Sequence, residues 1–146
     1  MNEGYVPAVV GVTPESIKAF VAQQWPANPN NAECLEVSGR HAAVEIPVRP
    51  ESIRPGGFIS GPTQFAAADV ALWYACFGAI GLEAMALTSE LSIRFVRPAT
   101  GDRLTARADL HSVGSRQIVG SVTIWTDDPA RPVSVAQGSY MAPRQT

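Results

Sequence analysis

The alternation of apolar and polar positions predicts a short helix, two strands, one long apolar helix and then four strands. Residues 1–12 are interpreted as an arm. The short helix, over 13–25, begins at Thr13-Pro14, because Thr caps a helix N-terminus and Pro suits the first turn. It should end near Trp25-Pro26, since proline disfavours helical geometry in the residue before it. Its apolar face has the spacing of an amphipathic helix, carried by Ile17, Phe20 and Val21.

A strand hairpin is predicted next. Apolar and polar residues alternate over 35–38 and again over 44–48, with a turn at Gly39-Arg40 between them. Pro47 indicates an edge strand, because proline has no N–H to donate to a neighbouring strand. Residues 50–62 contain three prolines and three glycines, and they are interpreted as a loop.

Residues 63–82 carry almost no polar side chain, and their six alanines favour a helix that other elements can approach closely. A helix without a polar face is expected to be buried on all sides. Gly78 and Gly81 mark its C-terminal end. A membrane span is disfavoured for this segment, because Asp69 would place a carboxylate in the lipid.

From residue 88 onward, apolar residues recur at every second position. This alternation predicts four strands near 88–96, 104–111, 118–125 and 133–141. Short turns join them, so we expect a four-stranded antiparallel meander. With the hairpin, they predict an α+β fold, in which a curved antiparallel sheet of about six strands wraps around one long central helix.

The composition is that of one globular domain. The chain has 146 residues, of which 46% are hydrophobic and 16% charged, and these values exclude a disordered chain. We expect a single domain over 1–146 with its core in 33–141. The net charge of −2 and the scattered arginines exclude a nucleic-acid partner. The N-terminus lacks a signal-peptide pattern, so we expect a cytoplasmic protein without a membrane partner.

The cysteines and histidines show no spacing typical of a metal site or a catalytic pair. Cys34 and Cys76 form no CxxC motif, so no metal is expected and they are interpreted as reduced core thiols. His41 and His111 are interpreted as surface residues. Helical spacing favours packing over a pocket wall for Trp73, Tyr74 and Phe77.

Asp69 is the residue that the long apolar helix does not explain. A carboxylate on a buried helix costs free energy unless it is paired or hydrogen-bonded. One interpretation is structural: Asp69 is held by Arg54, Arg94 or a backbone amide, or it emerges at the edge of a subunit. The other is chemical: Gly61 at the helix N-terminus would offer a free N–H to a developing oxyanion, and Asp69 would activate water or attack directly. Acyl transfer needs these two parts.

Three segments resemble the hotdog-fold acyl-CoA thioesterases, especially the phenylacetyl-CoA and 4-hydroxybenzoyl-CoA thioesterase branch: GGFISGPTQFAAADVALWYA, LTSELSIRFVRPATGDRL and VGSRQIVGSVTIW. The resemblance spans roughly residues 33–141. It implies that Asp69 is the catalytic carboxylate and that the Gly61 N–H polarises the thioester carbonyl. It also implies that Thr88, from the partner subunit, orients water.

The sequence departs from the family pattern at three positions. Ser60 stands where relatives have His, Pro62 replaces the second Gly of their His-Gly-Gly triplet, and Arg54 stands where they often have Asn or Gln. Ser60 is also a favoured helix cap. Arginine suits CoA phosphates, and we expect substrate contacts from Arg54, Ser60, Gln64 and Arg116.

The expected activity is hydrolysis of an acyl-CoA or aryl-CoA thioester to the free acid and CoA, without a cofactor. Six strands hardly cover a fully buried helix, so we expect a homodimer with its pocket at the interface, and the resemblance adds a possible dimer of dimers. One alternative is a non-hydrolytic hotdog protein that binds acyl-CoA or another acyl ligand. Another is a hydratase or dehydratase, although no His stands near Asp69. The acyl group stays open, as does a carrier protein in place of CoA.

Overall fold

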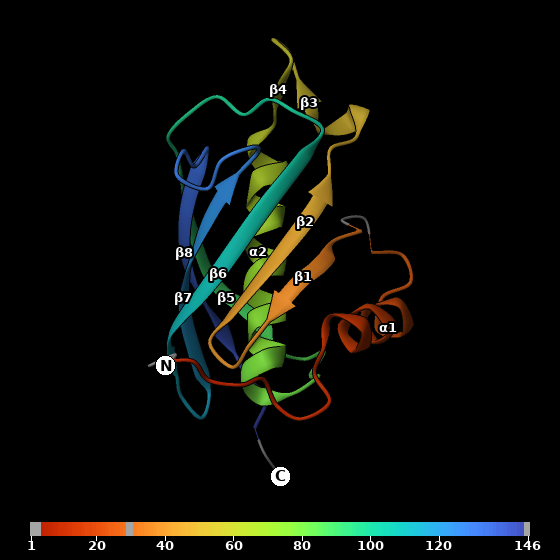
Figure 1. Cartoon of the computed structure of the whole chain (residues 1–146), viewed down its shortest axis with the longest axis vertical. Coiled ribbons are helices and arrows are strands. Elements are labelled where there is room, and N and C mark those ends of the chain that lie inside the picture. The colour runs from red at the N-terminus through yellow and green to blue at the C-terminus, as the bar shows by residue number, and fades with distance from the viewer. Residues whose placement is uncertain (1–3, 29–30, 145–146) are drawn as a thin grey trace.

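The computed structural model describes residues 4–28 and 31–144, so residues 1–3 of the predicted arm lie outside it (Figure 1). Within the described residues, the first elements are α1 (Pro14–Gln24), β1 (Glu33–Val37), β2 (His41–Pro47), a 3₁₀ helix (Pro50–Ser52), β3 (Ile53–Arg54) and β4 (Phe58–Ile59). They are followed by α2 (Gly61–Ile80), β5 (Leu87–Phe95), β6 (Arg103–Val113), β7 (Gln117–Trp125) and β8 (Ser134–Met141).

The main sheet has six antiparallel strands in the order β1-β2-β6-β7-β8-β5. Figure 1 shows α2 running along one face of this sheet, whose strands curve around the helix. The predicted α+β architecture is therefore confirmed. Alternate residues of each inner strand face α2, as in β6, where the buried set is Leu104, Ala106, Ala108 and Leu110.

The predicted four-stranded meander is wrong for its first strand. β6, β7 and β8 are consecutive neighbours, but β5 pairs with β8 at the far edge and β2 pairs with β6. Three strand spacings of about 4.8 Å separate β5 from β6, and the seven residues of 96–102 are long enough to cross them. Alternation reveals which residues form a strand, but it does not reveal which strand lies beside it.

Two further expectations in this half of the chain are corrected. β2 is an inner strand, and Pro47 is tolerated because it is the last residue of β2, two residues beyond the end of its pairing with β1. The predicted loop over 50–62 contains the small β3–β4 hairpin, closed by Pro55-Gly56-Gly57. Both glycines have positive φ angles, which non-glycine residues rarely adopt.

Helix α2 begins after the expected Ser60 cap, two residues before the predicted start, and ends before Gly81. Ser60 is the N-cap, with its hydroxyl oxygen accepting a hydrogen bond from the Thr63 N–H at 3.3 Å. Gly81, with φ +100°, ends the helix. Gly78 lies inside the helix instead of marking its end, and it allows close packing, because a Cβ there would clash with the Ser38 carbonyl oxygen.

One side of α2 stays open in the single chain, so the six strands do not by themselves bury the helix on all sides. Ala67, Ala71 and Ala75 are fully buried against the sheet. Phe65, in contrast, is 39% exposed, and Asp69 is only half-buried. The sheet covers one side of a cylinder, and covering the other side would take further structure.

The N-terminal segment packs around the C-terminal half of α2. The described part of the arm is held by backbone hydrogen bonds from the Val9 N–H to the Gly78 carbonyl and from the Gly39 N–H to the Val6 carbonyl. Helix α1 has the predicted Thr13 cap. Its Phe20 ring meets Phe77 edge to face, with 5.5 Å between the ring centroids. This packing fixes the position of the end of α1.

Candidate active site

The carboxylate of Asp69 lies where α2 faces two neighbouring strands. Its Oδ1 accepts a hydrogen bond from the Thr88 hydroxyl of β5 at 2.7 Å and another from the Tyr140 hydroxyl of β8 at 2.5 Å. Thr88 and Tyr140 are partners in the β5–β8 register, so the sheet presents the two hydroxyls together. The interpretation with Arg54, Arg94 or a backbone amide as the partner of Asp69 is wrong, because two side-chain hydroxyls hold this carboxylate.

A pocket of about 420 Å³ opens beside this carboxylate. Asp69 and its two hydroxyl partners line it, and so does Trp25 at the end of α1, which meets Trp73 of α2 edge to face with 6.3 Å between the ring centroids. The remaining wall consists of Gln24, Val70, Ala84, Met85, Ala86 and Leu87. Trp73 packs against the core as predicted, with 4.9 Å between its ring centroid and that of Phe77, and it also lines the pocket. Tyr74 and Phe77 are core residues as predicted.

Tyr140 is a hydrogen-bond donor at this site. Burial raises the pKa of its phenol far above the usual range, and the negative charge of Asp69 raises it further. The phenol therefore keeps its proton wherever Asp69 is charged, and it donates that proton to an acceptor. A hydrogen bond to a charged carboxylate is stronger than one between neutral groups.

Gly61 is the first residue of α2, and its N–H is not part of the helix ladder. No acceptor contacts this N–H among residues 4–28 and 31–144. Asp69 lies eight residues further along the same helix, a distance of about 12 Å at 1.5 Å per residue. The Gly61 N–H and the Asp69 carboxylate of one chain therefore cannot contact the same carbonyl group.

Thr88 was expected from a partner subunit, and this expectation is wrong, because the Thr88 hydroxyl contacts Asp69 of its own chain. The residue that lies remote from Asp69 within one chain is Gly61. The ring of Phe95 on β5 lies beside Gly61, 3.2 Å from the position that a Cβ on Gly61 would take.

The four residues expected to contact substrate do not line the Asp69 pocket of their own chain. Arg54 is exposed on the β3–β4 hairpin, where its Nε donates to the Pro55 carbonyl at 3.2 Å. The Nε of Arg116 donates to the Ala142 carbonyl at 2.9 Å. Ser60 caps α2. Gln64 is 4% exposed; its amide nitrogen donates to the Ile59 carbonyl, and its Oε1 is buried without a partner among the described residues.

Sequence reasoning missed two residues of the site, Tyr140 and Trp25. Tyr140 lies on the same face of β8 as the alternate residues Ser134, Ala136 and Gly138. This alternation could have predicted that Tyr140 faces α2. Nothing in the sequence indicates that it lies opposite Asp69. Trp25 was interpreted only as the end of a helix, and its place in the pocket depends on how α1 packs.

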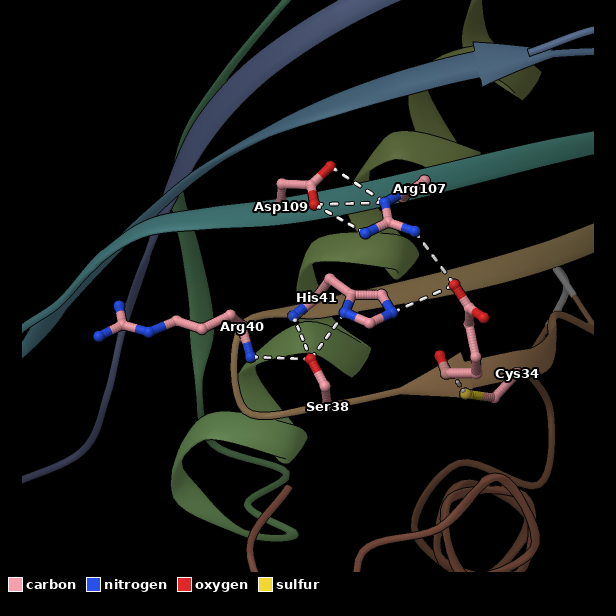
Figure 2. A network of polar contacts seen from close by, with 7 residues as sticks. Cys34, Ser38, Arg40, His41, Arg107 and Asp109 are labelled. Atoms are coloured by element: carbon pink, nitrogen blue, oxygen red, sulfur yellow. Dashed lines mark hydrogen bonds and ion pairs between the residues drawn. The ribbon is translucent and has the colours of Figure 1, made fainter. Parts of the chain in front are cut away.

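A second polar network lies on the outer face of the sheet (Figure 2). The His41 Nδ1 lies 2.6 Å from the Ser38 hydroxyl, and its Nε2 lies 3.1 Å from Oε1 of Glu36. Arg107 also binds Glu36, and it pairs with Asp109. The Ser38 hydroxyl is buried and accepts the N–H groups of residues 40 and 41, so it closes a turn and is not a nucleophile.

His41 is partly exposed on this outer face, and His111 is exposed, so both lie at the surface as predicted. Both cysteines are free and buried, which agrees with reduced core thiols. In the described residues, no helix has the length and apolarity to cross a membrane.

The comparisons with known proteins agree with this geometry. A sequence profile of the thioesterase superfamily matches residues 56–133, more than half of the chain. A candidate thioesterase from Silicibacter sp. TM1040 has 25% identity over 96% of each chain, with a TM-score of 0.82. Among proteins with curated descriptions, none matches this sequence.

Two less similar structures share the fold. The PaaI protein from the phenylacetic acid degradation operon of E. coli has 24% identity over 88% of this chain and 91% of its own, with a TM-score of 0.69. Zebrafish thioesterase superfamily member 2 has 14% identity over 90% of this chain and 99% of its own, with a TM-score of 0.74. By its sequence profile, its curved sheet and its central helix, this chain belongs to the thioesterase superfamily and has the hotdog fold.

Proposed function

We propose that the protein hydrolyses an acyl-CoA or aryl-CoA thioester to the free acid and CoA. The observation that carries this proposal is the Asp69 carboxylate, which lines an open pocket and is held there by two hydroxyls instead of a cation. A structural carboxylate needs no pocket, whereas a carboxylate that reacts with a thioester must be reachable from solvent. Membership of the thioesterase superfamily supports the same chemistry.

The reaction needs water and no cofactor. As a general base, Asp69 takes one proton from water while the water oxygen bonds to the thioester carbon. The tetrahedral oxyanion then collapses, the C–S bond breaks, and the CoA thiolate takes the proton from Asp69. As a nucleophile, Asp69 instead bonds to the carbon and expels the thiolate, and water cleaves the resulting anhydride, with one proton passing to the thiolate. The Gly61 N–H would stabilise the oxyanion in either route.

This chemistry requires two copies of the chain. The Gly61 N–H is about 12 Å from Asp69 along one helix, so the oxyanion donor has to come from the partner subunit. The open side of α2 and the outer edge of β5, which is one of the two edge strands of the sheet, are surfaces available for association. Leu87 and Phe95 on β5 are 55% and 51% exposed, which is typical of an interface rather than a solvated edge. We propose a homodimer or a dimer of dimers.

The substrate-binding residues fit the same two-chain site. Ser60 and Gln64 flank the N-terminus of α2, near the proposed position of the thioester carbonyl. Arg54 is exposed, and Arg116 lies at the β6–β7 turn, so both guanidinium groups suit the CoA phosphates better than the reacting carbon. The half-open pocket beside Asp69 would take the acyl group.

A thiol-release assay with short, medium, long and aromatic acyl-CoA substrates tests the proposal. The variant Asp69→Asn keeps the size of the side chain and its ability to accept hydrogen bonds, but it removes the base and the nucleophile. We expect hydrolysis to fall at least a hundredfold, because general acid–base catalysis contributes about 10²–10⁴-fold. Hydrolysis within about threefold of wild type, on the order of 0.7 kcal/mol, would show that Asp69 has no catalytic role.

The departures at the N-terminus of α2 favour one other function, the binding of an acyl ligand without hydrolysis. Ser60, Pro62 and Arg54 replace the residues that the resembled family has there. A binding protein would gain thermal stability with acyl-CoA but release no thiol from any member of the panel. Thiol release that depends on Asp69 would exclude this alternative.

A further inference from the structure

Both hydroxyls at the proposed active site contact the same oxygen of Asp69. The Thr88 and Tyr140 hydroxyls donate to Oδ1, at 2.7 and 2.5 Å. The Tyr140 oxygen also lies 2.9 Å from the Asp69 backbone carbonyl. A phenol has one proton, and the shorter distance and the negative charge of the carboxylate favour Oδ1 as its acceptor. No donor within residues 4–28 and 31–144 contacts Oδ2.

This asymmetry distinguishes the two oxygens chemically. An oxygen that accepts two short hydrogen bonds has its lone pairs directed at those donors, and much of its charge is stabilised by them. The other oxygen keeps its lone pairs available for a proton or a carbon atom. Because Tyr140 is 4% exposed and is paired on both sides, with Thr88 of β5 and Ile118 of β7, its hydroxyl cannot move far from Oδ1.

We propose that Tyr140 is a positioning residue that, with Thr88, holds Asp69 by Oδ1 and so makes Oδ2 the reacting oxygen. This inference rests on the proposed function, and it adds a residue that acts through Asp69. It also defines how Thr88 could orient water. Its hydroxyl proton is donated to Asp69, so its oxygen can only accept a hydrogen bond from water.

Removing the Tyr140 hydroxyl leaves Oδ1 with one donor, the Thr88 hydroxyl. The terminal torsion of an aspartate is broad, so the carboxylate could then rotate and present either oxygen to the substrate.

The test compares Tyr140→Phe with Tyr74→Phe. The second variant also loses a phenol hydroxyl, but from a buried tyrosine that donates to the Ala32 carbonyl and not to Asp69. We expect Tyr140→Phe to lower kcat about 10- to 100-fold with KM within about twofold. Tyr74→Phe should leave both kcat and KM within about twofold of wild type.

Two further variants guard against a folding defect in Tyr140→Phe. Thr88→Val removes the other donor without changing the shape of the side chain, and it should also lower kcat with little change in KM. Thr88→Ser keeps the hydroxyl and should recover most of that loss. Equal kcat values for Thr88→Val and Thr88→Ser would overturn the proposal that two hydroxyls hold Oδ1.

A readout independent of hydrolysis separates this inference from the proposed function. Carbon-13 NMR of protein labelled at the aspartate carboxyl groups, with the Asp69 signal identified by Asp69→Asn, reports the hydrogen bonds on this group directly. At one fixed pH, an Asp69 carboxyl signal that moves in Tyr140→Phe and stays in place in Tyr74→Phe supports the inference even if no acyl-CoA is hydrolysed. The same signal position in wild type and Tyr140→Phe would overturn it, whereas activity retained by Asp69→Asn would overturn the proposed function.

Discussion

Trp25 and Trp73 meet edge to face with 6.3 Å between their ring centroids, although one ends α1 and the other lies in the middle of α2. Both line the pocket beside Asp69. The N-terminal helix therefore supplies part of the wall of the proposed acyl site, in addition to covering the core.

Trp25→Ala should widen this pocket and change the preference for acyl length. Trp25 is 45% exposed, so the change should cost little stability, about 0.5–1.5 kcal/mol for the lost aromatic pair. The ratio of kcat/KM for a long over a short acyl-CoA should rise about tenfold, because a methylene or two of added room is worth about 1–3 kcal/mol. Trp125→Ala, at the end of β7 and outside the pocket, is the control. Equal ratios in the two variants would contradict this role.

Gly61→Pro tests the proposed oxyanion donor. Proline is well tolerated at the first position of a helix, and it removes the N–H without removing the backbone. The extended conformation of Ser60, with φ −67° and ψ 154°, is compatible with a following proline. We expect kcat to fall about 10²–10³-fold with the fold intact by circular dichroism.

Gly61→Ala is the matched control for that substitution. Its Cβ lies as close to the Phe95 ring as the proline Cβ would, but it keeps the N–H. Its kcat should stay within a few-fold of wild type. A similar loss in both variants would assign the effect to the contact with Phe95 instead of the missing donor.

Leu87→Lys should separate the subunits. Leu87 is 55% exposed on the unpaired edge of β5, and a lysine on a strand edge opposes pairing with a second strand. Sedimentation velocity at micromolar concentration should show a monomer, and thiol release should fall with it, because Asp69 would lack a partner's Gly61. Val10→Lys, at a fully exposed position of the arm, should remain a dimer. A monomer with full activity would refute the shared site.

Stability should fall in alkaline solution because of the buried thiols. Burial raises the pKa of Cys34 from 9.0 to about 11, and burial together with the charge of Asp69 raises that of Cys76 from 9.0 to about 12. Below pH 9 both states hold these protons, so the thiols add no pH dependence. Between pH 9 and the folded values only the unfolded chain releases them, which lowers the free energy of unfolding by about 1.4 kcal/mol per pH unit for each thiol.

Urea unfolding at pH 8 and pH 10.5 measures this effect. Cys76→Ala should be less stable at pH 8, because it leaves a small cavity, but its stability should fall less steeply with pH. Burial also raises the pKa of Tyr74 and Tyr140, so their ionisation in the unfolded chain lowers the free energy of unfolding as well, but only above pH 10. Equal unfolding free energies at the two pH values would show that folding does not raise the pKa of the thiols.

Much of the fold could be predicted, because local rules decide it. Thr13 and Ser60 cap helices through their own hydroxyls, and Gly81 ends α2 through a positive φ angle. Alternation identified the inner face of β6, since a strand with one buried face has a period of two. Asp69 was found because a carboxylate within an alanine-rich helix conflicts with burial, and such conflicts are frequent at functional sites.

Only the tertiary structure decided which strands and side chains are neighbours. The position of β5 beside β8 brings Thr88 next to Tyr140, and no local pattern encodes a pairing between residues 52 positions apart. The packing of α1 brings Trp25 to the pocket in the same way. Sequence periodicity fixes the face on which a side chain lies, because that face is set by backbone geometry. The partner of a side chain across the fold depends on the packing of the whole core. For this reason only the tertiary structure shows that the Thr88 and Tyr140 hydroxyls hold Asp69.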